Sequence, residues 1–224
     1  MKITDSGFHN ISEVEEASIV ISSWIQAVFF DNNSKVSEII LEENAQLKYF
    51  GYFWEENTFN KHIITKGEKS SAKINCFLLA QENQKITSKV FGEVAASESK
   101  IDTDIIALAK NEGSIDIDGI IQINNGVEKV EWYLNETNIF LWDKWSVRGF
   151  PTLLVRSNDV QAGHGCNIEK ISDEKLFYLR SRWIGKENAL TMMVIAYIET
   201  IFGDLQKYNQ DFHDTLVSQI INDI

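Results

Sequence analysis

Three side chains that can ligate a transition metal lie within six residues of one another, at His164, Cys166 and Glu169. They offer an imidazole, a thiolate and a carboxylate, a mixture of soft and borderline ligands that suits iron. A plainer interpretation stays open, because a single histidine between glycines is commonly a hydrogen-bonding turn residue and a free cysteine is commonly an inert buried thiol. The residues therefore predict a turn at 163–169 that carries three candidate metal ligands.

The other cysteine and the glycine-containing segments of the sequence predict no further reactive site. Cys76 lies in the apolar stretch 74–80, where packing in the core is the better interpretation. The two cysteines are far apart and neither belongs to a C-x-x-C pair, so the sequence predicts no disulfide framework and fits a reducing cytoplasm. The chain contains no G-x-x-x-x-G-K-[ST] motif, and so it has no phosphate-binding loop of its own.

Carbohydrate chemistry is a second class of function that the residues allow. A carbohydrate-active enzyme needs paired carboxylates on one face, and Glu128 with Glu131, or Asp116 with Asp118, could supply them. Six tryptophans could form a binding platform for sugars. Tryptophans spread this widely along a chain are more often anchors of a core or an interface.

Composition and charge exclude several partners. The formal net charge is −12, from 33 acidic and 21 basic residues, and such a field repels a phosphate backbone, so nucleic acid is not an expected partner. Apolar residues make up 44% of the chain, which is ordinary for a globular protein. No window reaches the roughly 18 uninterrupted apolar residues of a membrane span, and no membrane partner is expected.

A β-rich body is expected from about residue 14 to residue 160. Short apolar or alternating runs there are separated by small polar turns at 42–45, 66–69, 110–113, 124–126 and 143–144. The unequal intervals indicate a degenerate repeat, which suits a solenoid and suits a sandwich nearly as well. The segment 19–30 is ambiguous between a strand pair and a helix, and its β-branched residues favour strands.

Helical periodicity follows the β-rich body. Ser172 is a good N-cap with two acidic residues after it, and a first helix is expected from there to about Gly185. A second, buried along one stripe, is expected over 190–202, and a weaker third reaches the C-terminus. We therefore expect a β domain at 1–165 and a helical domain at 166–224.

Two linked motifs bridge these regions. The first is N-D-V-Q-A-G-H-G-C at residues 158–166, and the second is L-F-Y-L-R-S-R at residues 176–182. They resemble the D-D-V-x-x-x-H-G-A segment and the L-F-Y-L-R-S-R-G helix of the SufB/SufD family of iron-sulfur cluster assembly scaffolds. The similarity extends forward through 189–202 and, more faintly, backward through 119–123 and 138–141, so that it covers about half of the chain.

The resemblance implies a mainly β protein with a right-handed parallel β-helix core followed by a C-terminal α-helical domain. It implies a cytoplasmic scaffold rather than an enzyme, on which an iron-sulfur cluster resides only transiently. Its partners would be a SufC-like ABC-type ATPase, bound by the C-terminal helices, and a second scaffold, either another copy or a SufB/SufD paralogue, paired through the β-helix core.

The resemblance also assigns residues. His164 matches the histidine that the SufD-type subunit contributes to an assembly site shared by the pair. The residues expected to bind the ATPase are Leu176, Phe177, Tyr178, Arg180 and Arg182. Arginines two positions apart on a helix point to different sides, so at most one of them is expected to be central to that contact.

The chain departs from the family pattern in three places. The SufB-type cysteine would follow an Asp-Lys pair, but Asp143 and Lys144 precede Trp145, so the chain is SufD-like there or the thiolate has moved to Cys166. Trp183 stands where the pattern has glycine. The β region begins almost at once, whereas family members usually carry an N-terminal helical region, so we expect a short form that is able to pair with itself. A degenerate paralogue that retains only ATPase docking is a further alternative.

Overall fold

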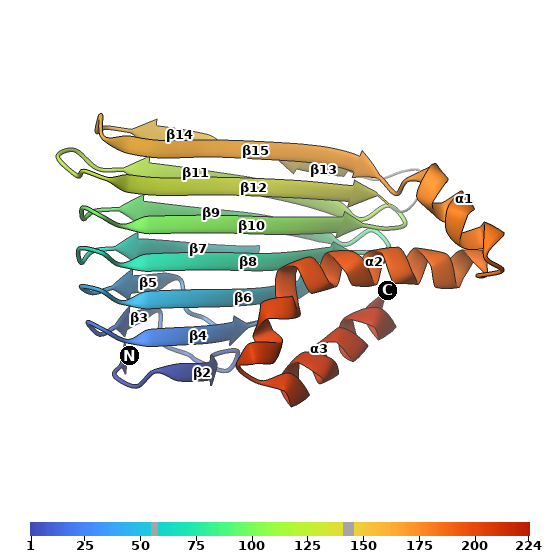
Figure 1. Cartoon of the computed structure of the whole chain (residues 1–224), viewed down its shortest axis with the longest axis horizontal. Helices are drawn as coiled ribbons and strands as arrows, with labels where there is room; N and C mark the ends of the chain where they lie inside the picture. Colours follow the sequence, from blue (N-terminus) through green and yellow to red (C-terminus); the bar gives the residue numbers. More distant parts are fainter. Residues whose placement is uncertain (55–57, 141–145) are drawn as a thin grey trace.

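The computed structural model describes residues 1–54, 58–140 and 146–224, and Asp143, Lys144 and Trp145 lie outside these ranges. The described backbone winds into a parallel β-helix whose coils stack from the N-terminal to the C-terminal end, with helices on one side (Figure 1). This confirms the expected β-helix with C-terminal helices. Every strand pairing among the described residues is parallel, which argues against the sandwich.

The strands alternate between two sheets. The first sheet contains β1 (Lys2–Ile3), β3 (Ser18–Ile21), β5 (Glu38–Leu41), β7 (Thr58–Thr65), β9 (Lys85–Val94), β11 (Ser114–Ile123), β13 (Ser146–Gly149) and β14 (Thr152–Val155). The second contains β2 (Gly7–Asn10), β4 (Gln26–Asp31), β6 (Gln46–Trp54), β8 (Ser71–Ala80), β10 (Lys100–Ala109), β12 (Val130–Phe140) and β15 (Val160–Lys170). The ambiguous segment 19–30 is a strand pair, as its composition favoured.

The coils widen along the chain, which explains the degenerate repeat. Gln26 pairs with Gln46, 20 residues on, whereas Lys100 pairs with Glu131, 31 residues on. The corners before β4, β6, β8, β10 and β12 repeat the same conformation, with left-handed φ values at Trp24, Asn44, Lys69, Glu98 and Lys129. The polar turns expected at 42–45, 66–69, 110–113 and 124–126 are thus corners of a solenoid, spaced by coils of unequal length, and the turn expected at 143–144 lies outside the described residues.

The interior of the β-helix is an apolar core between the two sheets. Its side chains come from alternate positions of every coil, because successive residues of a strand point to opposite faces. Trp132 is buried there against Gly92, where a Cβ atom would lie 1.8 Å from the indole ring. Cys76 is buried in the same core, and burial raises the pKa of its thiol, as expected for an inert packing residue.

One ion pair is buried inside the N-terminal coils. Lys61 Nζ lies 2.9 Å from Asp31 Oδ2, and the two side chains are 4% and 0% exposed. The Tyr49 hydroxyl donates to the same oxygen at 2.8 Å, and the Ser34 hydroxyl donates at 2.7 Å. Lys61 also donates to the Val36 carbonyl. The pair is therefore part of a hydrogen-bonded network that ties three coils together.

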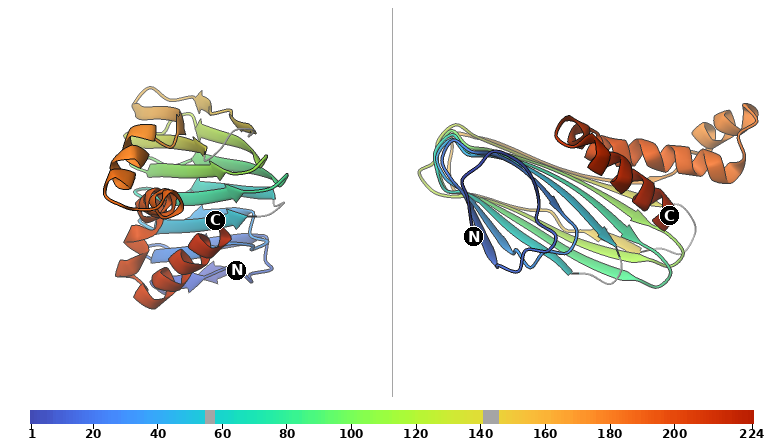
Figure 2. Two further views of the ribbon diagram at one scale, coloured as in Figure 1. Left: turned by 90° about the vertical axis from the view of Figure 1, so that its right-hand side faces the viewer. Right: turned by 90° about the horizontal axis from the view of Figure 1, so that it is seen from below.

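The C-terminal helices lie outside the second sheet (Figure 2). They are α1 (Asp173–Ser181), α2 (Lys186–Phe202), the short 3-10 helix η1 (Gly203–Lys207) and α3 (Gln210–Asp223). The Ser172 hydroxyl accepts from the Lys175 N–H and caps α1, as predicted. The α2 stripe expected to be buried packs, together with α3, on the outer face of β4, β6, β8 and β10 in a second apolar core.

The boundary between strand and helix differs from the expected one, and one helical segment is unusually apolar. The expected domain limit at 165/166 falls inside β15, and the change from strand to helix comes between Lys170 and Asp173. The segment Lys186–Lys207 has the length and composition of a membrane span, although it contains charged residues. The buried stripe of α2 on the second sheet accounts for that apolar character within this fold.

Candidate functional site

The motif that carries the resemblance forms the last strand of the β-helix. The expected turn at 163–169 is wrong, because all of β15 runs in parallel register beside β12, from Val130 opposite Val160 to Phe140 opposite Lys170. The two glycines are extended strand residues here. Beyond β15 the second sheet has no further strand among the described residues, so the motif lies at an uncovered end of the solenoid (Figure 1).

The predicted metal ligands divide between the two faces of β15. His164 and Cys166 stand opposite Leu134 and Glu136, whose side chains are buried, and therefore belong to the inward row. Glu169 belongs to the outward row, where its Oε1 accepts from the Tyr197 hydroxyl of α2 at 3.1 Å. Burial, followed by this hydrogen bond, raises the pKa of Tyr197 to about 12. Glu169 thus lies apart from His164 and Cys166.

Glu136 is a site residue that the sequence analysis missed. Its side chain points into the last coils and is 1% exposed, and within the described ranges no group except the adjacent Cys166 thiol is placed to donate a hydrogen bond to its carboxylate. Burial raises the pKa of this carboxyl to about 7, against a smaller lowering by the Cys166 thiol beside it. The missed signal was the period-two inward row of β12, in which Trp132 and Leu134 are followed by polar Glu136 and Asn138.

Cys166 has two polar neighbours from β12. The Asn138 amide nitrogen donates to its Sγ at 3.4 Å, and the Glu136 carboxylate lies on the other side. Burial, with the nearby negative charge of Glu136, raises the pKa of the Cys166 thiol. The described residues contain no group of three or more His, Cys, Asp or Glu side chains that could hold a metal ion, so the predicted trio does not form one centre.

Three of the four carboxylates of the carbohydrate hypothesis lie in ion pairs. Asp116 contacts Lys85 and Arg148, each at 3.2 Å. Asp118 lies 3.9 Å from Lys89. Glu131 lies 3.1 Å from Lys100, and Glu128 is in a corner turn. These are lateral contacts along the outer faces of neighbouring coils, and no arrangement among them favours glycoside hydrolysis.

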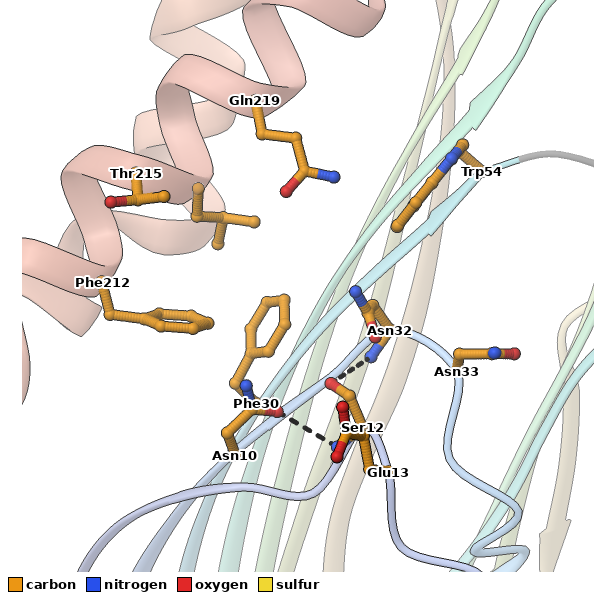
Figure 3. A pocket seen from close by; sticks show the side chains of 11 residues that line it. Asn10, Ser12, Glu13, Phe30, Asn32, Asn33, Trp54, Phe212, Thr215 and Gln219 are labelled. Carbon is orange, nitrogen blue, oxygen red and sulfur yellow. Dashed lines mark hydrogen bonds between the residues drawn. The ribbon is translucent and has the colours of Figure 1, made fainter.

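One hollow in the described structure is remote from β15. It measures about 720 Å³ and lies between α3 and the N-terminal coils, where Gln219 of α3 and Trp54 of β6 point into it (Figure 3). Its floor is fixed by Ser12, which donates its N–H to Asn10 and accepts from the Asn32 N–H. The hollow contains none of the predicted site residues.

The first helix presents an apolar surface to solvent. Leu176 and Leu179 turn toward the second apolar core, whereas Phe177 is 75% exposed and Tyr178 is also exposed. Arg182 lies over the Tyr178 ring at 5.4 Å, and Arg180 is exposed. A shallow groove of about 450 Å³ runs between α1 and α2, lined by Glu174, Lys175, Tyr178, Leu179, Met192, Met193 and Ala196.

Trp183 ends α1 in a conformation that normally selects glycine. Its φ is +64°, its N–H donates to the Arg180 carbonyl, and the Ile184 N–H donates to the Leu179 carbonyl, which together form a Schellman motif. A left-handed residue other than glycine costs roughly 1 kcal/mol. The indole is 98% exposed, so no packing in the described chain offsets this cost.

Comparison with known proteins agrees with the fold. The family described as "SUF system FeS cluster assembly, SufBD core domain" matches residues 56–197, a range that includes β15 and α1. The iron-sulfur cluster assembly protein SufD of Escherichia coli (strain K12) is 24% identical over 138 residues, which cover 62% of this chain and 33% of that protein.

Two SufBD family proteins extend the comparison. One from Mycobacterium leprae (strain TN) is 25% identical over 206 residues, with 77% of this chain and 23% of that protein covered. Another from Staphylococcus haemolyticus (strain JCSC1435) is 24% identical over 205 residues, with 77% and 44% covered. The chain thus spans less than half the length of these relatives. Because the family match covers more than half of the chain and includes its site, the protein belongs to the SufB/SufD family of iron-sulfur cluster assembly proteins.

Proposed function

We propose that this protein is a non-enzymatic scaffold subunit of a cytoplasmic SUF-type complex, on which an iron-sulfur cluster is assembled transiently. The observation that carries the proposal is the position of the family motif, which places His164 on the inward row of an uncovered terminal strand. The cluster is cargo and leaves with its acceptor. Energy comes from a SufC-like ATPase, since the chain has no phosphate-binding loop.

Pairing with a second scaffold takes place at the C-terminal end of the β-helix. The outer edge of β15 leaves a row of backbone groups without strand partners among the described residues, and such an edge is a template for pairing with another chain. Phe150, Leu154 and Ile168 expose apolar surface at the same end. The partner is a copy of this chain or a SufB/SufD paralogue, and either one would cover His164 and Cys166.

The ATPase binds to α1 and to the groove behind it. Phe177, Tyr178 and Trp183 form an exposed aromatic surface beside Arg180 and Arg182, and aromatic residues with arginine are the usual anchors of protein interfaces. The left-handed φ of Trp183 supports this assignment, because strain that the fold does not offset is typical of positions retained for function.

Replacing Trp183 by glycine is expected to separate docking from stability. Glycine adopts the left-handed conformation freely, so the variant should be as stable as the wild type or more stable by up to about 1 kcal/mol. Loss of the indole should weaken binding of the co-expressed SufC-like ATPase by about tenfold or more. Urea unfolding and a quantitative pull-down measure the two effects.

Trp24 provides a matched control for this experiment. Its φ is +67° and its side chain is 71% exposed, but it lies at a corner of the N-terminal coils. Trp24→Gly should relieve similar strain and leave ATPase binding unchanged. Equal ATPase binding by wild type and Trp183→Gly would refute the assigned docking surface, and failure of the wild type to bind any SufC-like ATPase would refute the scaffold function.

A further inference from the structure

We propose that Glu136, Asn138 and Cys166, here called the inner polar cluster, bind one thiophilic divalent metal ion at the C-terminal end of the β-helix. The ion is of the Fe²⁺, Co²⁺ or Zn²⁺ class, and His164 is not one of its three proposed ligands. The proposal rests on the proposed function only in naming Fe²⁺ as the ion bound in the cell.

Buried oxygen atoms at the end of the β-helix have few hydrogen-bond donors around them. Glu136 is almost fully buried, and Asn138 is fully buried two positions further along the same inward row. In the described residues, Oδ1 of Asn138 accepts no hydrogen bond, and the only group beside the Glu136 carboxylate that can donate one is the Cys166 thiol, whose proton a bound metal ion would displace. Buried acceptors without partners cost free energy, and a cation placed among them would remove that cost.

The side chains of the inner polar cluster lie close to one another. A Cβ atom built on Gly149 would lie 2.4 Å from Glu136 Oε2 and 3.3 Å from Cys166 Sγ, so both atoms border the same small space. A Cβ on Gly119 would lie 2.8 Å from Glu136 Oε1. The side-chain amide of Asn138, whose Oδ1 is the proposed ligand atom, donates through its Nδ2 to Cys166 Sγ at 3.4 Å. Two glycines therefore border the carboxylate, and the one at position 149 leaves open the space that the thiol shares with it.

Within the described structure, the inner polar cluster carries an unpaired negative charge and can be reached from solvent. Among the described residues no basic side chain forms an ion pair with Glu136, and Arg148, at the neighbouring strand, is paired with Asp116. Cys166 is exposed at the end of the solenoid, whereas the two β12 residues lie beneath it, so an ion can reach the cluster from the uncovered end. This exposed thiol above a buried carboxylate differs from Cys76, which is closed inside the core.

The donor set selects the class of ion. A thiolate with a carboxylate and an amide oxygen favours transition metals over Mg²⁺ or Ca²⁺, which prefer oxygen ligands alone. On binding, a metal–sulfur bond replaces the S–H bond of Cys166, and the displaced proton leaves to solvent. No change of oxidation state is required.

Anaerobic titration of the full chain with Co²⁺ tests the inference, because a cobalt–thiolate bond gives a charge-transfer absorption band. The wild type should bind one Co²⁺ with this band. Cys166→Ser should abolish the band, and Glu136→Gln should weaken binding by about tenfold or more. Gly149→Ala, which fills the shared space, should also weaken it. Circular dichroism of each variant verifies that the fold is retained.

Glu169→Gln, altered on the opposite face of β15, and Cys76→Ser are the controls, and both should bind Co²⁺ as the wild type does. A wild type without the band, a band that survives Cys166→Ser, or unchanged affinity in Glu136→Gln would overturn the inference. Binding of the SufC-like ATPase is measured on the same preparations. Loss of the metal site with intact ATPase binding would refute this inference alone, whereas a bound Co²⁺ without ATPase binding would refute only the proposed function.

Discussion

Replacement of Lys61 by methionine is expected to lower the free energy of unfolding by about 3–5 kcal/mol. The substitution leaves Asp31 buried as an unpaired carboxylate, held only by the hydroxyls of Tyr49 and Ser34 and by nearby backbone N–H groups. Breaking one half of a buried ion pair is costly because the remaining charge stays desolvated. Urea denaturation at neutral pH measures the loss.

Two further variants define the origin of this effect. Lys61→Met combined with Asp31→Asn removes both charges and should recover a large part of the lost stability. Lys100→Met breaks an ion pair with Glu131 in which both side chains are 45% exposed, and it should cost no more than about 1 kcal/mol. Equal losses for Lys61→Met and Lys100→Met would contradict a buried, coupled network in the N-terminal coils.

Glu136→Gln is expected to change how stability depends on pH. The pKa of Glu136 is about 7 in the folded protein, above its ordinary value of 4.5, so the folded state binds this proton more tightly than the unfolded state. This contribution to stability is full below pH 4.5 and is lost as the pH rises through 7. The wild type should therefore lose about 3 kcal/mol that the glutamine variant keeps.

The comparison is made by urea unfolding from pH 4 to pH 9 with a chelator present, so that no metal ion occupies the cluster. Glu131→Gln changes an outward carboxylate of the same strand and should leave the shape of the wild-type curve unaltered. Parallel stability curves for wild type and Glu136→Gln would show that Glu136 is not a buried, uncompensated acid.

Local patterns predicted the helices and the position of the strands. The buried stripe of α2 and the Ser172 cap follow from residues within one or two turns of each other, so a single sequence contains the necessary information. The strand conformation of 163–169 could not be predicted from local sequence, because β15 is held by pairing with β12, 30 residues earlier. Glycines on both sides of His164 favoured the wrong local structure.

Local sequence also limited how the candidate ligands could be grouped. His164 and Cys166 share a face because they are two positions apart on a strand, whereas Glu169 lies on the opposite face; the turn expected at 163–169 had grouped all three. Glu136 became visible only through the register that aligns it with Cys166. Sequence could flag the polar residues of the inward row in β12, but only the stacking of coils shows what they face.

The scaffold function is tested most directly by anaerobic iron-sulfur reconstitution with the cognate SufC-like ATPase and ATP, followed by measurement of iron and acid-labile sulfide per complex. Wild type should assemble a cluster, His164→Ala should lose most of it while still binding the ATPase, and Glu169→Gln, altered on the opposite face of β15, should match wild type. Cluster content in His164→Ala equal to that of the wild type would contradict assembly at this end of the β-helix.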